Sequence, residues 1–359
     1  MSIKFILIFI VILSIYGAAN YYIARNLLAL LNKPKRVTKL IFWVMYILLA
    51  LSPVLTRLIE LDFLKIVSDY WFYIFMYGLM LTIISQIVYV ILRKKYKQWI
   101  GISAIAALIL LGFVGHHYAY TPVVKSFEMN RPEVSKLDHL KIVVASDTHL
   151  GLLSNKKHLE KFVAIANKEK PDLVILAGDV VDDSPKWFNE QKMNETMKKL
   201  KTTYGVYAVL GNHEYIGKEI KETKEAMKKS NITLLQDETI KIKEDFFLTG
   251  RDDATNQSRK SLAQLRENIA KSDAWIVIDH QPNKEMADEG VSLMMSGHTH
   301  KGQLWPGNLM TRNIYPLDYG HTKKNNTDYV VTSGYGFWGP PMRIGTQSEL
   351  WSIDVNFNR

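Results

Sequence analysis

The sequence predicts two parts of different fold class: N-terminal all-α transmembrane helices over residues 1–120 and a C-terminal α/β domain over residues 141–359. Two observations predict this division. Isoleucine, leucine, phenylalanine and tyrosine are concentrated in the first third of the chain, whereas the remainder has lysine- and glutamate-rich stretches. In the remainder, short β-branched runs alternate with helical patterns, an order typical of α/β folds. The polar, irregular residues 121–140 between the two parts are expected to form a linker.

Four apolar runs in the first third are candidates for membrane-spanning helices. Three of them approach or exceed the roughly 20 residues that a helix needs to cross a bilayer. The second run is shorter and contains Pro53. A signal peptide would account for the first run alone, so a multi-pass anchor is the better interpretation. The runs cover residues 5–23, 40–55, 70–92 and 99–118.

Loop charge predicts how these spans are oriented. The first and third connections are rich in lysine and arginine and contain no acidic residue, whereas the second contains both signs. Because positively charged short loops stay in the cytoplasm, both termini and the α/β domain are expected on the extracytoplasmic side of the cell membrane. No ionisable residue lies deep within the four runs, so the sequence does not indicate a transport path.

Net charge and cysteine content narrow the possible partners and sites. A charge of +10 at pH 7 fits a phospholipid bilayer with an anionic surface. A nucleic-acid phosphodiesterase would also be basic, but the C-terminal part has no basic stretch interleaved with aromatic residues, so no nucleic acid is expected as a partner. The chain contains no cysteine, which excludes disulfides and thiolate metal ligands.

The C-terminal part contains five short apolar runs that are predicted strands. Helical patterns separate the first three, and such strand–helix–strand units imply an open sheet with polar groups gathered at the carboxyl ends of its strands. The strands are expected at residues 141–146, 173–177, 206–210, 275–279 and 291–295, and the helices at residues 156–169 and 187–201.

Polar side chains directly follow each of these predicted strands. The first three groups are spaced by roughly 30 residues, about one βαβ unit, so they should emerge side by side at one edge of the sheet. Any one of these motifs alone is more often a turn or a helix cap, but five in order indicate one site. The motifs are Asp147-Thr-His149, Gly178-Asp-Val-Val-Asp182, Gly211-Asn-His-Glu214, His280 and Gly297-His-Thr-His300.

The residue types in these motifs suit two adjacent divalent cations. Imidazole nitrogens together with carboxylate and amide oxygens are a ligand set that suits Mn, Fe or Zn. Mg and Ca prefer sites made of oxygen ligands alone, so they fit this set less well. A carboxylate has two oxygens to share between two cations, which makes Asp179 the best bridging candidate. Two cations about 3.5–4 Å apart can hold a phosphate and activate a hydroxide for in-line attack. The predicted ligands are Asp147, His149, Asp179, Asn212, His280, His298 and His300.

Other residues near the motifs have predicted roles beside the metals. His213 follows Asn212 and would face the same cavity, where a histidine can donate a proton to the leaving oxygen near neutral pH. Asp182 and Glu214 are expected to orient the ligands or this histidine. Lys301 could contact substrate phosphate or be a solvated lysine, and Arg343 could contact phosphate or form a structural ion pair.

As a set, the five motifs resemble those of the calcineurin-like metallophosphoesterase family, over about residues 140–355. The resemblance implies a four-layer α/β/β/α sandwich with two mixed sheets. It also implies that His213 is the catalytic acid and that two metal ions are bound. The first ion would be held by Asp147, His149, Asp179 and His300, and the second by Asp179, Asn212, His280 and His298.

A narrower resemblance concerns one branch of this family. The stretches GHTHKGQ and YVVTSGYGFWGPPMRIG and the multi-span N-terminus are similar to a membrane-anchored bacterial branch that includes UDP-2,3-diacylglucosamine pyrophosphatase-like proteins. In that branch Gly-Gly often follows GHTH, whereas Lys301-Gly302 follows it here. The change leaves the ligands intact and adds a basic group at the rim of the site.

The sequence therefore predicts a membrane-anchored, metal-dependent hydrolase of phosphodiesterase or pyrophosphatase type. Its substrate would be a phosphorylated small molecule, a sugar nucleotide or a phosphorylated lipid. The alternative is a metal-binding membrane module that senses or scaffolds without turnover, and the presence of His213 argues against it. The sequence leaves open the substrate, the metal, the preference among monoesters, diesters and pyrophosphates, and the oligomeric state.

Overall fold

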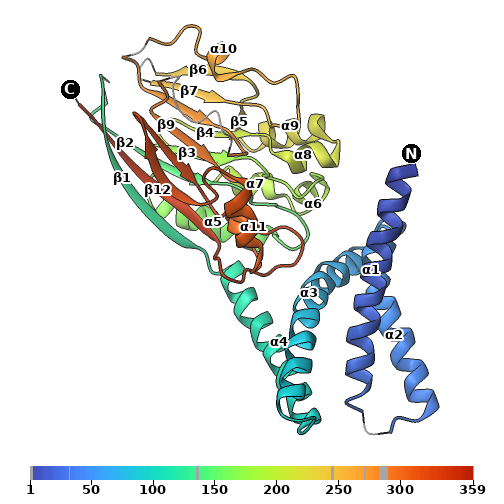
Figure 1. Cartoon of the computed structure of the whole chain (residues 1–359). Coiled ribbons are helices and arrows are strands. Elements are labelled where there is room, and N and C mark those ends of the chain that lie inside the picture. Colours follow the sequence, from blue (N-terminus) through green and yellow to red (C-terminus); the bar gives the residue numbers. More distant parts are fainter. Residues whose placement is uncertain are drawn as a thin grey trace. The chain divides into compact units, whose positions relative to one another are not determined.

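The computed structural model describes residues 3–31, 33–134, 137–243, 246–270, 272–282 and 290–358. The chain forms two compact units, Met1–Val114 and Gly115–Arg359 (Figure 1). The boundary therefore falls before the last turn of the fourth apolar helix, whereas the sequence places it after residue 120. The difference arises because this last turn packs with the α/β unit.

Long apolar helices make up the first unit. They are α1 (Ile3–Leu28), α2 (Arg36–Leu55), α3 (Asp62–Ile91) and α4 (Lys97–Tyr120), which continues into the second unit. Among the described residues, these four helices are long and apolar enough to cross a membrane.

Hydrogen bonds between side chains connect the first three of these helices. The indole Nε1 of Trp71 on α3 donates to the hydroxyl of Tyr16 on α1 at 2.9 Å. The hydroxyl of Tyr46 on α2 donates to Asn20 on α1 at 3.2 Å. Lipid tails are as apolar as the side chains of such helices, so burial of apolar surface gives little driving force for helices to associate in a bilayer. Hydrogen bonds between side chains then help to hold the helices together.

Two six-stranded sheets form the centre of the second unit, and each mixes parallel and antiparallel pairs, as predicted. The first sheet has the order β1-β12-β2-β3-β4-β5 and the second β10-β11-β9-β8-β7-β6. The strands of the first sheet are β1 (Val123–Val134), β12 (Glu349–Asn358), β2 (His139–Ala145), β3 (Leu173–Ala177), β4 (Val206–Val209) and β5 (Ile232–Leu234). Those of the second are β10 (Gly320–Lys324), β11 (Thr327–Val331), β9 (Leu293–Ser296), β8 (Trp275–Ile278), β7 (Phe246–Gly250) and β6 (Glu238–Ile242).

The period of two along the strands sorts side chains between the layers. On β2, Ile142 and Val144 lie in the core between the two sheets, whereas Val143 and Ala145 pack against the helices on the outer face of the first sheet. The helices of the unit are α5 (Lys156–Lys168), α6 (Lys186–Glu190), α7 (Met193–Met197), α8 (Asn212–Gly217), α9 (Ile220–Lys229), α10 (Leu262–Leu265), the 3₁₀ helix η1 (His300–Gly302) and α11 (Gly307–Ile314).

Two local expectations differ from the structure. The segment expected to be a linker contains β1, which pairs in parallel with β12, more than 200 residues further along the chain. The sequence does not predict this strand, because its residues are largely polar and the strand that it pairs with lies far along the chain. The single helix expected at residues 187–201 is instead α6 and α7, separated at Lys192, whose φ of 52° is incompatible with a right-handed helix.

A buried ion pair connects the two sheets at one end. The guanidinium of Arg131 on β1 donates to the carboxylate of Asp328 on β11 at 3.1 Å, and both side chains are almost fully buried. The same guanidinium donates to the carbonyl of Asn326 at 2.7 Å. Arg131 therefore anchors the edge strand of one sheet to the β10–β11 hairpin of the other.

We predict that Arg131→Ala lowers the free energy of unfolding by about 3 kcal/mol, because it leaves a buried carboxylate without its main partner. The nearby His321 and Lys323 side chains should limit the loss. Urea titration of the purified full chain in detergent, followed by tryptophan fluorescence, measures the change. Arg312→Ala, at an exposed position of α11, serves as the control. Equal effects of the two substitutions would contradict this role of Arg131.

Candidate metal centre

The polar residues of the five motifs meet where the carboxyl ends of strands from both sheets come together. Three motifs follow β2, β3 and β4 in the first sheet, and two follow β8 and β9 in the second. Backbone hydrogen bonds join the loops in pairs. The amide of Asp147 donates to the carbonyl of Gly178 at 3.0 Å, and the amide of Gly297 donates to the carbonyl of His280 at 2.9 Å. All seven predicted ligands are brought into one region.

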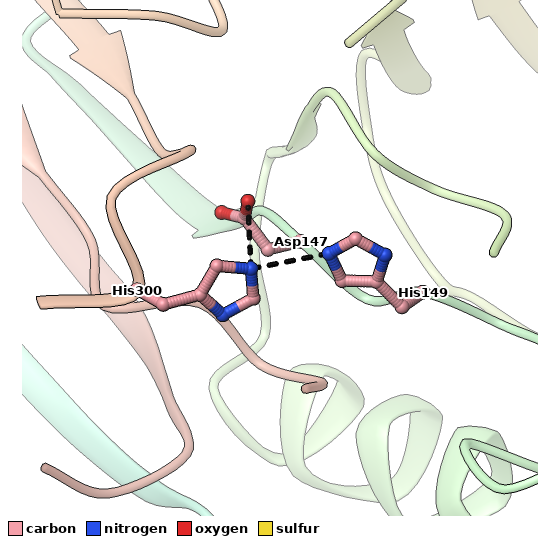
Figure 2. Close-up of side chains that lie close together, drawn as sticks. All are labelled: Asp147, His149 and His300. Atoms are coloured by element: carbon pink, nitrogen blue, oxygen red, sulfur yellow. Dashed lines mark hydrogen bonds and ion pairs between the residues drawn. The ribbon is translucent and has the colours of Figure 1, made fainter. Parts of the chain in front are cut away.

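The first cluster consists of Asp147, His149 and His300, which point toward one another in Figure 2. The Nε2 atoms of His149 and His300 are 3.1 Å apart. His300 Nε2 is 3.4 Å from a carboxylate oxygen of Asp147. All three side chains are buried, so the cluster is shielded from water.

The second cluster consists of Asp179, His280, His298 and Asn212. His280 Nε2 lies 3.1 Å from Asp179 Oδ2 and 3.2 Å from Asn212 Oδ1. His298 Nδ1 lies 2.7 Å from the same amide oxygen. Asp179 Oδ2 is also 3.8 Å from His149 Nε2, so this carboxylate lies between the two clusters.

The electrostatics of the first cluster fit a bound cation. Burial lowers the pKa of His149 to about 3 and that of His300 well below its ordinary value, so both imidazoles are neutral. Burial also raises the pKa of Asp147 to about 6, which shows how costly its ionised form is without a positive partner. Neutral imidazole nitrogens facing each other beside buried carboxylates form a nitrogen and oxygen ligand set for a divalent metal. The clusters are consistent with the dinuclear metal site typical of the resembled family.

The backbone of the ligand loops adopts conformations that most side chains avoid. Five predicted ligands have positive φ: Asp147 at 51°, His149 at 40°, Asp179 at 49°, His298 at 69° and His300 at 49°. Positive φ in non-glycine residues is uncommon and clusters at functional sites. The turns aim these side chains at a common point and are stabilised by the surrounding sheets.

Glycines in the motifs allow the loops to approach one another. A Cβ on Gly211 would lie 2.2 Å from Asp179 Oδ1, and a Cβ on Gly178 would lie 2.4 Å from His280 Nδ1. Side chains at these positions would displace a ligand. The glycines that precede Asp179 and Asn212 therefore have a steric role in the site.

His213 lies beside both clusters, and its carboxylate partner is not among the site residues predicted from the sequence. Its Nδ1 is 2.6 Å from Asp183 Oδ1, and its backbone amide donates to Asp179 Oδ1 at 2.9 Å. Burial alone would lower the pKa of His213, but Asp183 and the carboxylates of Asp179 and Asp182 together raise it to about 9. The sequence signal for this partner was that a second aspartate, Asp183, directly follows Asp182 at the end of the motif. Which one reaches the histidine depends on the turn, where Asp183 has a φ of 57°.

The predicted orienting residues Asp182 and Glu214 lie next to the ligands. Glu214 accepts hydrogen bonds from the amides of Val180 at 2.7 Å and Gly211 at 2.7 Å, so it connects the loops of two motifs. Asp182 Oδ1 is 3.8 Å from His149 Nδ1.

The two basic residues with predicted substrate contacts occupy different environments. Arg343 is fully buried and donates to the carbonyls of Gly334 and Gly336, and its Nη2 is 3.4 Å from His300 Nδ1. These contacts favour the structural alternative, although its partners are carbonyls rather than the expected ion-pair acid. Lys301 is half-buried, with its ammonium 4.0 Å from the centre of the Tyr319 ring.

Comparisons with known proteins identify the family. Residues 140–302 match the family model of the calcineurin-like phosphoesterases. An uncharacterized metallophosphoesterase of Campylobacter jejuni is 28% identical, with 98% of each chain covered. An uncharacterized metallophosphoesterase of Aquifex aeolicus is 30% identical over 69% of this chain and 97% of its own. A transmembrane protein with metallophosphoesterase domain of Danio rerio is 28% identical over 69% of this chain and 60% of its own. The chain belongs to the calcineurin-like metallophosphoesterases.

Proposed function

We propose that this protein is a membrane-anchored hydrolase that cleaves phosphoester or pyrophosphate bonds with two divalent cations. The observation that carries the proposal is the position of Asp179. Its carboxylate lies close to His149 of the first cluster and to His280 and His298 of the second. Asp147, His149, Asp179 and His300 would hold one ion, and Asp179, Asn212, His280 and His298 the other. Mn, Fe and Zn fit these ligands. When bound, such a pair withdraws charge from phosphate oxygens and lowers the pKa of water.

The chain's own residues supply the proton for the leaving oxygen. The bond from His213 Nδ1 to Asp183 orients the imidazole, so that Nε2 would be the nitrogen that donates to the substrate. The nearby carboxylates favour the protonated form of His213, which is the form a general acid needs. Glu214 and Arg343 hold the ligand loops and serve as positioning residues.

A substrate that carries its phosphate on a lipid or a sugar nucleotide suits a catalytic domain tethered to a bilayer. Four candidate spans precede the domain, and relatives are named as transmembrane proteins. Loop charges support a cell-membrane location with the domain on the extracytoplasmic side. The resemblance to UDP-2,3-diacylglucosamine pyrophosphatase-like proteins supports such a substrate.

We predict that Asp179→Asn reduces hydrolysis of bis-p-nitrophenyl phosphate at least about 100-fold and lowers the bound metal per chain, because both ions lose a carboxylate ligand. Initial rates with Mn, Zn or Fe(II), together with elemental analysis of the purified full chain, measure the two effects. Asp354→Asn, which removes a partly exposed carboxylate on β12, should change neither. Metal binding without turnover in the unmodified protein would support the sensor or scaffold alternative.

We predict that Asp183→Asn slows hydrolysis of diphenyl phosphate by roughly 10-fold or more but affects bis-p-nitrophenyl phosphate less. The reason is that phenolate is a poorer leaving group than p-nitrophenolate and depends more on a proton from His213. The ratio of kcat values for the two diesters is the measurement, with Glu195→Gln on α7 as an exposed control. An equal loss on both diesters would contradict general-acid assistance through this pair.

We predict that a reporter enzyme that works only outside the cytoplasm is active when it is fused after the C-terminus. The reason is that an even number of spans with positive first and third loops places both termini outside. Activity of a reporter that works only in the cytoplasm would reverse the orientation and leave the catalytic proposal standing.

A further inference from the structure

Helix α11, at the edge of the metal centre, exposes apolar side chains rather than burying them. This helix, which is described over its full length, has no buried residue. Met310 is 66% exposed and Ile314 59% exposed. Clustered exposed apolar side chains indicate a surface that contacts lipid or protein. We call it the α11 surface, and it comprises Trp305, Leu309, Met310, Ile314 and Trp338.

Two members of this surface, Trp305 and Trp338, lie outside the helix. Trp305 immediately precedes the turn into α11. Trp338 is connected through Gln303, because the Trp338 amide donates to Gln303 Oε1 at 2.9 Å and Gln303 Nε2 donates to the Trp338 carbonyl at 2.8 Å. These bonds hold Trp338 close to the segment that leads into α11.

The C-terminal end of α4, from Gly115 to Tyr120, lies close to this surface within the second unit. The carbonyl of Gly115 accepts a hydrogen bond from the amide of Arg343 at 2.9 Å. A Cβ on Gly115 would lie 3.0 Å from the side chain of Ile344, whose carbonyl accepts from the amide of Trp305 at 2.8 Å. A short chain of contacts thus runs from the end of α4 to the start of α11.

This proximity determines what the α11 surface contacts. If α4 crosses the bilayer, its last turn lies at the lipid–water interface, and so does the side of the α/β unit that holds this turn. Tryptophan is enriched at that depth. Arg312 is exposed on α11, whose sequence has no acidic residue, which suits anionic headgroups. We propose that the α11 surface inserts into the headgroup region of the bilayer that anchors the chain.

The same surface borders the metal centre. The ring of Tyr315, directly after α11, has its centre 5.6 Å from that of His298. The ring of Trp338 has its centre 6.0 Å from that of His213. An amphiphilic phosphoester that keeps its apolar part in the bilayer would bring its phosphate to this side of the site. The inference rests on the proposed membrane anchoring and specifies a lipid surface as the partner.

Single-cysteine labelling tests the proposal, since the chain has no native cysteine. Met310→Cys and Ile314→Cys each receive an environment-sensitive fluorophore, and Glu225→Cys, at an exposed position on α9, is the matched control. The full chain is reconstituted in vesicles of phosphatidylcholine and phosphatidylglycerol, with and without doxyl-labelled lipid. We expect both α11 probes to shift to shorter wavelength and to lose most of their emission with doxyl lipid, whereas the Glu225 probe keeps its emission.

Two results would overturn the proposal. One is quenching of the α11 probes no greater than that of the Glu225 probe. The other is a shift to shorter wavelength without quenching, which would show that protein, such as a second copy of the chain, covers the surface. Flotation of the same vesicles reports anchoring, and turnover of bis-p-nitrophenyl phosphate by the unlabelled protein reports hydrolysis. Failure of the lipid contact is thereby distinguished from failure of the proposed function.

Discussion

The structure of the α/β unit depends on keeping a carboxylate, Asp179, buried between two groups of imidazoles. A charge in that position is costly unless positive charge or hydrogen-bond donors lie against it. His149 of the first cluster and His280 and His298 of the second lie within reach of its oxygens, and the backbone amide of His213 donates a hydrogen bond to it. The close approach at Gly211 and the bonds from two loops to Glu214 keep this arrangement compact. The left-handed backbone of the ligands is the conformational cost of gathering them around one point.

Much of the fold could be predicted because its signals are local. β3 was predicted with its observed bounds, and the other four predicted strands differ only at their ends. The ligand residues were recognisable because each follows a buried strand and the carboxyl ends of neighbouring strands meet. β1 was not recognised because its pairing partner is β12, and no local pattern reports a contact over such a distance.

The remaining features of the site depend on side-chain direction, which composition and spacing do not specify. Asp182 and Asp183 are chemically identical, and only the turn decides that the second one reaches His213. Arg343 is also ambiguous in sequence, since a guanidinium suits phosphate and backbone carbonyls equally well. Its burial against Gly334 and Gly336 becomes visible only once the loop is folded. The exposed apolar residues of α11 could not be distinguished in the sequence from ordinary core residues.

The pairing of β1 with β12 has a consequence for biosynthesis. β1 begins at Val123, directly after the last apolar helix, and β12 is formed by Glu349–Asn358 at the other end of the unit. β12 also separates β1 from β2 in the first sheet. A ribosome therefore produces β1 long before its sheet partner. Until β12 leaves the exit tunnel, β1 lacks its sheet partner and is an edge exposed to chaperones and proteases, so the first sheet is completed only after more than 200 further residues have been synthesised.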